Sequence, residues 1–187
     1  DRERMVKIAN NYDLDSNMFM SPEEIRKLID LSGENNRFVR LVERESGEKT
    51  FLRIFDDEMV FPTEAEITAA FKRLVMDLPT VGFLQGHGER DCAKEGDRDY
   101  NLFAWAKTYR YALINRGFDI VEVSLSEELP EKLDILVIAD MKTPLSGEEM
   151  ARLNAYVERG GNLLIVGEPR RQEVMNPIIE QFGVQLM

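Results

Sequence analysis

Cysteine, histidine and long apolar runs are scarce in this sequence. Cys92 and His87 are each the single residue of their type among 187. One cysteine excludes an internal disulfide, and a metal site that used it would need ligands of other kinds. No stretch approaches the roughly 18–20 apolar residues of a membrane-spanning helix, and no signal peptide is visible. The first residues read as the middle of a longer protein, so we expect a soluble piece whose parent carries any membrane anchor elsewhere.

Basic side chains are also in short supply. The 24 lysines and arginines are outnumbered by 35 aspartates and glutamates, which gives a formal net charge of -11. Proteins that bind phosphate backbones need a basic face, and anionic membrane surfaces attract basic segments. We therefore expect no nucleic-acid partner. The hydrophobic share of 43% is ordinary for a globular protein with a core.

The first 78 residues are expected to form a small α+β segment, which could be part of a larger module. Residues 1–20 are polar and are predicted to be irregular. Ser21-Pro22-Glu23-Glu24 has the pattern of a capping box at a helix start. Two β-rich runs, residues 38–45 and 49–55, are joined through Ser46-Gly47 and predict a hairpin.

A second capping box, Thr63 to Glu66, opens a helix that ends before Pro79, where we place the boundary of a second domain at residues 79–187. The pattern then changes to alternating strands and helices. Such alternation predicts right-handed crossovers and an open, doubly wound, mainly parallel α/β sheet. The expected elements are strands at 80–84, 118–125, 134–140 and 162–169, helices at 100–115, 146–159 and 176–182, and the start of a further strand at 184–187. A third capping box, Ser146 to Glu149, opens the second of these helices.

Polar residues follow the strands of this predicted sheet. In open parallel sheets, ligands bind outside the carboxyl ends of the strands, near a switch in strand order. The sequence therefore predicts a ligand-binding site there, made of Gly86, His87, Gly88, Glu89, Asp140 and Glu168.

A catalytic interpretation of the same residues is weaker. His87 could act as a general base oriented by Glu89 or Asp140. Cys92 lies in a polar loop, and no nucleophile elbow occurs anywhere in the chain. One histidine with scattered carboxylates is weak ground for a metal, and both the dinucleotide fingerprint and the phosphate-binding loop are absent. We assign no catalytic residue, no metal site and no cofactor from the sequence.

Two stretches carry a family resemblance, "ITAAFKRLVMDLPTVGFLQGHGERD" and "DILVIADMKTPLSGEEMARLNAYVERGGNLLIVGEP". The sequence resembles the auxiliary component of bacterial ABC-type transport systems, the gliding-motility G-type proteins, over about residues 64 to 170. The matching motifs are Gly86-His87-Gly88-Glu89, the apolar run 134–140, Leu145-Ser146, Tyr156, Gly160-Gly161 and residues 163–166.

The resemblance implies a flavodoxin-like or class I glutamine amidotransferase-like sandwich. It also implies a parent protein anchored by flanking membrane helices, with this piece extracytoplasmic (periplasmic) and associated with the membrane and ATPase subunits of the transporter. The family supplies no established reaction. Our first interpretation is a non-catalytic domain that binds a partner subunit, a small ligand or a surface polymer. The alternatives are a hydrolase or carbohydrate-active enzyme that uses His87 and Glu89, and a cytoplasmic flavodoxin-like binding module.

Overall fold

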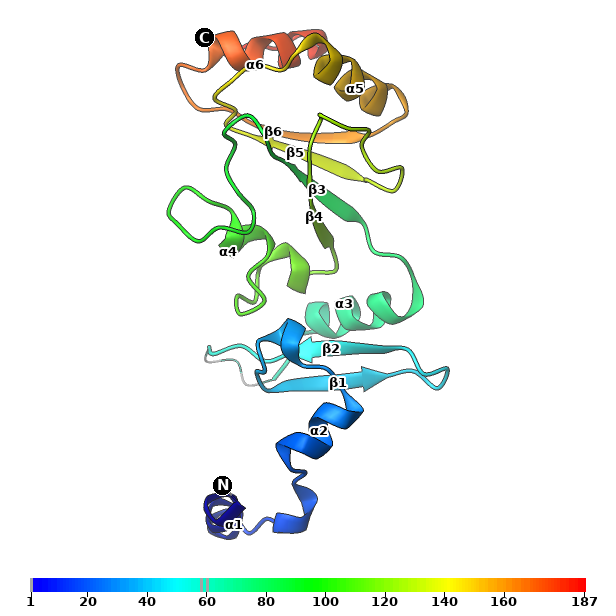
Figure 1. The fold of residues 1–187 in the computed structure, drawn as a ribbon, viewed down its shortest axis with the longest axis vertical. Helices are drawn as coiled ribbons and strands as arrows, with labels where there is room; N and C mark the ends of the chain where they lie inside the picture. Colours follow the sequence, from blue (N-terminus) through cyan, green and yellow to red (C-terminus); the bar gives the residue numbers. More distant parts are fainter. Residues whose placement is uncertain (1, 58, 60) are drawn as a thin grey trace. The chain divides into compact units, whose positions relative to one another are not determined.

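A computed structural model describes residues 2–57, 59 and 61–187 (Figure 1). The chain divides into two compact units, residues 1–38 and residues 39–187. Within the described residues, every helix is too short or too polar to cross a membrane.

The first unit is helical. It contains α1 (Arg2–Asn11), α2 (Pro22–Leu28) and two 3-10 turns, η1 (Ser16–Met18) and η2 (Ser32–Glu34). The predicted capping box is confirmed, because Ser21 and Glu24 bond each other's main-chain N–H groups. The prediction of irregular structure over residues 1–20 is wrong for α1, where Met5, Ile8 and Ala9 have helical spacing and charged residues such as Arg4 and Lys7 have high helix propensity.

The second unit begins with the predicted hairpin. Strands β1 (Val39–Glu43) and β2 (Lys49–Arg53) pair antiparallel, and helix α3 (Glu64–Val75) starts at the predicted capping box of Thr63 and Glu66. The hairpin is tied to a segment much later in the chain, the 3-10 turn η3 (Leu113–Asn115), because Arg53 Nη1 donates to Asn115 Oδ1 at 2.9 Å.

The centre of the second unit is a four-stranded sheet in which all strands run parallel, so the predicted α/β class is confirmed (Figure 1). Its order is β4 (Asp119–Val123), β3 (Thr80–Leu84), β5 (Ile135–Ala139), β6 (Asn162–Val166). The chain leaves β3 toward β4 and then returns to the other side of β3 at β5. The carboxyl ends of β3 and β5 therefore form a topological switch point.

Apolar cores form on both faces of the sheet, although one side of β6 stays exposed at Leu164 and Val166. Helices α5 (Gly147–Glu158) and α6 (Gln172–Ile179, followed by η4, Glu180–Phe182) supply Leu153, Tyr156, Met175 and Ile178 to the apolar core on one face. The other face packs against α4 (Asn101–Ala104), η3 (Leu113–Asn115) and the residues around them.

Two predicted elements are wrong. The helix expected at residues 100–115 stops after α4 and continues as turns into η3. The Asn115 side chain donates to the carbonyl of Tyr109 at 2.7 Å, and Arg110 turns into buried ion pairs, so tertiary contacts override the helical spacing. Residues 184–187 form no strand, because the Leu186 N–H donates instead to the Asn176 side chain at 2.8 Å.

Candidate functional site

The exit turn of β3 lies at the switch point. Gly86 and Gly88 have φ values of +123° and +78°, a backbone region that glycine enters without strain. The carbonyl of His87, between them, accepts the N–H groups of Lys142 at 2.8 Å and Thr143 at 3.2 Å. These two bonds fasten the turn to the exit of β5.

The His87 ring is held between two carboxylates. Its Nδ1 lies 3.4 Å from Glu89 Oε1, and its Nε2 lies 3.3 Å from Glu149 Oε1. The side chain of Glu89 is 1% exposed, and its other oxygen accepts the His87 N–H at 2.7 Å. The imidazole is therefore almost buried and has an acidic group at each ring nitrogen.

The exits of β5 and β6 meet the same edge. Asp140 is buried, adopts a left-handed φ of +52°, and donates its N–H to the carbonyl of Val166 at 2.7 Å. Its Oδ1 lies 3.4 Å from Arg171 Nε, at the start of α6. Glu168 forms an ion pair with the Arg90 side chain, and the main-chain N–H of Arg90 donates to the Ala139 carbonyl.

Unpartnered polar atoms collect at this edge. Among the described residues, five buried side-chain atoms have no hydrogen-bond partner, and four of them are His87 Nδ1, Glu89 Oε1, Asp140 Oδ1 and Arg171 Nε. The Nδ1–Glu89 and Asp140–Arg171 contacts lie within ion-pair distance but lack hydrogen-bond geometry, whereas His87 Nε2 is hydrogen-bonded to Glu149 Oε2 at 3.3 Å. We call the residues of these three exits, together with Glu149 and Arg171, the strand-exit edge.

The structure brings the six predicted site residues to the strand-exit edge, and a ligand-binding role for them stays a prediction. Sequence reasoning recognised Glu149 as a helix cap but did not join it to His87, and it missed Arg171 altogether. Topology contains the missing signal. A helix that follows a parallel strand starts near that strand's carboxyl end, so the first turns of α5 and α6 can supply side chains to this edge.

The single cysteine is not available as a nucleophile. Although Cys92 lies in a polar loop, its side chain is fully buried against the sheet. Burial raises the pKa of the Cys92 thiol to about 12, with the charges of Glu122 and Asp91 acting in the same direction. A nucleophilic cysteine acts as the thiolate, so this thiol is poorly suited to that role.

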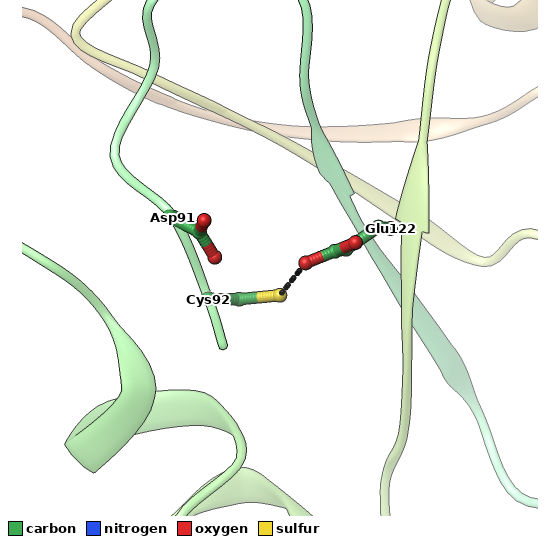
Figure 2. A group of neighbouring side chains, drawn as sticks. All are labelled: Asp91, Cys92 and Glu122. Atoms are coloured by element: carbon green, nitrogen blue, oxygen red, sulfur yellow. Dashed lines mark hydrogen bonds between the residues drawn. The ribbon is translucent and has the colours of Figure 1, made fainter. Parts of the chain in front are cut away.

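Figure 2 shows Cys92 pointing toward Glu122, with Asp91 beside it. The Sγ atom is 3.9 Å from Glu122 Oε1, and the three potential ligand atoms lie within 4.8 Å of one another. In the part of the chain that the structure describes, this is the one cluster of metal-capable groups, and His87 is outside it. Because acidic groups at a surface commonly cluster without an ion, we assign no metal to the cluster.

An apolar hollow of about 580 Å³ lies elsewhere, between β6, α6 and residues 184–186. Large hollows are the usual first candidates for ligand sites. Among the residues that the structure describes, none with an ionisable side chain lines this one. The strand-exit edge is therefore the stronger candidate, because it combines buried polar atoms that lack partners with strained backbone.

Comparison with known proteins identifies the family. Neither a curated protein nor a solved structure matches the chain significantly. A family model described as "ABC-type uncharacterized transport system" matches residues 78–182, more than half of the sequence. The match spans the whole parallel sheet and the strand-exit edge. The chain therefore belongs to the ABC-type uncharacterized transport system family of auxiliary proteins.

Proposed function

We propose that this chain is a non-catalytic binding domain of a gliding-motility-like auxiliary protein, and that its strand-exit edge binds a partner subunit of the transporter or a ligand. Family membership supports the connection to ABC-type transport. The observation that carries the binding role is the concentration of buried, unpartnered polar atoms at one edge of the sheet.

Burying such atoms without partners lowers the stability of the fold. A buried polar group without a hydrogen bond costs about 1–3 kcal/mol, and left-handed backbone at a residue other than glycine adds strain. Asp140 and Arg170 both have positive φ, and both follow strands that end at this edge. Unfavourable features that gather in one place, at the position where ligands bind in open parallel sheets, favour a binding role.

The geometry of His87 favours binding over turnover. A general base needs a ring nitrogen within reach of the substrate proton. Here each ring nitrogen faces a carboxylate, Glu89 on one side and Glu149 on the other. The protonated, buried Cys92 offers no substitute nucleophile.

The alternative is a hydrolase or carbohydrate-active enzyme that uses His87 and Glu89. The Nδ1 contact with Glu89 is the one observation that favours it, because catalytic histidines are commonly oriented by a carboxylate at that nitrogen. In this function Glu149 would have to leave Nε2 before a substrate could approach.

The first prediction separates the two functions. In the full-length protein, His87→Ala is expected to weaken association with the transporter's membrane and ATPase subunits by about tenfold or more, a loss of roughly 1.4 kcal/mol. The reason is that the ring joins the turn at 86–89 to α5. Co-purification and binding titrations measure the effect, and circular dichroism checks that the variant is folded.

Lys132→Ala is the matched control. Lys132 lies beside Thr80 and Asp134, at the start of the strands, and pairs with Asp77 on the surface. Association is expected to be unchanged in this variant. Unchanged association in His87→Ala would contradict the proposed binding role. Hydrolysis of a glycoside or ester substrate that disappears in His87→Ala would favour the enzyme instead.

We also propose that the domain lies outside the cytoplasm, as the resemblance to gliding-motility G-type proteins implies. A cysteine at exposed position 131, Glu131→Cys, is expected to react with a membrane-impermeant maleimide in intact cells that express the full-length protein. The burial and high pKa of the Cys92 thiol keep the background low, and Cys92→Ala removes it. Labelling that requires cell lysis would place the domain in the cytoplasm.

A further inference from the structure

The contacts of the His87 ring with its two carboxylate neighbours require one more hydrogen than a neutral imidazole supplies. A neutral imidazole has one N–H donor and one acceptor nitrogen, whereas an ionised carboxylate only accepts. Glu89 and Glu149 face opposite ring nitrogens. A neutral ring can therefore donate to one carboxylate only, and its other nitrogen must face an oxygen with no hydrogen between them.

Neither carboxylate is free to turn away. Glu89 Oε2 is held by the His87 N–H at 2.7 Å. Glu149 Oε2 is held by the Ser146 N–H at 2.8 Å, in the capping box that starts α5. That hydrogen bond is the main cause of the lowered pKa of Glu149, to which the charge of His87 contributes less. Glu149 therefore stays ionised, which leaves the imidazole and Glu89 as the groups that can take up the missing hydrogen.

We infer that Glu89, His87 and Glu149 share one additional proton, and that this proton acts as a latch between the turn at residues 86–89 and the first turn of α5. With the proton present, the ring bridges both carboxylates. When it is lost as the pH rises, two acceptors face each other and the contact opens. The inference deepens and rests on the proposed function, because the latch would regulate the exposure of the proposed binding edge.

Other charged groups near the ring do not supply this hydrogen. Lys142 directs its main-chain N–H to the His87 carbonyl, and its side chain lies beside Gly88. Asp140 and Arg171 lie within ion-pair distance of each other. Glu148, the neighbour of Glu149, is exposed and near Arg152. The two carboxylates at the ring nitrogens are therefore the charged groups in direct contact with the ring.

Hydrogen exchange of the 187-residue chain tests the latch without any partner. Amide protection is measured at Ser146, Glu149 and Met150, whose N–H groups are hydrogen-bonded in this turn, from about pH 5 to about pH 9, a range that covers histidine titration, and corrected for intrinsic exchange. In the wild-type chain, the opening equilibrium of this turn is expected to rise by up to about tenfold per pH unit once the proton is lost, the slope for one linked proton. No pH dependence would overturn the inference.

Glu89→Gln is the decisive variant. The Gln oxygen can still accept the His87 N–H, while its amide donates to Nδ1, so a neutral ring satisfies both neighbours. Protection is expected to stay high and independent of pH. Glu149→Gln serves as the second variant, because glutamine also completes a capping box and donates to Nε2. A wild-type pH profile in both variants would overturn the latch.

The two proposals fail separately. Exchange in the free chain involves no partner, so the absence of the latch there leaves subunit binding unaffected. Loss of the proposed function would appear as unchanged subunit association in His87→Ala, whatever the exchange profile.

Discussion

Replacing Arg110 with alanine is expected to destabilise the chain by about 3 kcal/mol or more, since removal of one partner from a buried ion pair leaves an uncompensated charge. The Arg110 side chain is 3% exposed and pairs with Glu66, whose side chain is buried to the same extent. It also donates to Asp57 at 2.7 and 2.8 Å and to the Met59 carbonyl at 2.9 Å. These carboxylates raise the pKa of Arg110, with the hydrogen bonds to Asp57 as the main cause.

Urea unfolding measures the loss, and two further variants test its origin. Lys132→Ala removes a fully exposed ion pair with Asp77, and no measurable change is expected because such pairs are screened by solvent. The double variant Arg110→Met, Glu66→Gln should recover part of the stability, because the buried Glu66 charge is then absent and glutamine still completes the capping box of α3. Equal midpoints for Arg110→Ala and the wild-type chain would show that the ion pair contributes little.

Gly161→Ala is expected to destabilise the chain by about 1–3 kcal/mol, the usual cost of overpacking a core. A methyl group at position 161 would overlap the ring of Tyr156. That ring is 1% exposed, and its hydroxyl donates to the Asn162 carbonyl at 3.0 Å, so it has no free space to enter. The effect should appear as a lower urea midpoint.

Gly147→Ala is the matched control, because nothing lies within 4 Å of the added methyl group. Its stability should stay within about 0.5 kcal/mol of the wild type, as for most surface substitutions. In a Tyr156→Leu background, Gly161→Ala should cost less, since the two positions are in contact and their effects are not additive. An equal cost in both backgrounds would rule out the proposed overlap.

The parallel sheet was predictable because each strand is a short apolar run followed by a helix with its own start signal. The run ILVIA, for example, is β5, the strand buried between β3 and β6. Capping boxes at Ser21, Thr63 and Ser146 all form as expected. These signals are local, so the sequence alone contains them.

The remaining features depend on contacts between distant segments. The aromatic residues near Tyr109 have helical spacing, but Arg110 and Asn115 are drawn into bonds with partners up to 62 residues away. The candidate site also depends on contacts between distant segments. His87 and Asp140 could be predicted because ligands bind at the carboxyl ends of parallel strands. The contact between His87 and Glu149 joins residues 62 positions apart and follows from the packing of α5.

The proposal that the strand-exit edge is the binding surface is tested most directly by the hydrogen-exchange footprint of the subunit complex. The full-length protein is compared alone and with the membrane and ATPase subunits used for the His87 variants. We predict that added protection concentrates in residues 86–91, 140–143 and 168–172, with residues 77–80 and 131–134 at the opposite ends of the strands unchanged. Protection confined to that opposite end would contradict the account.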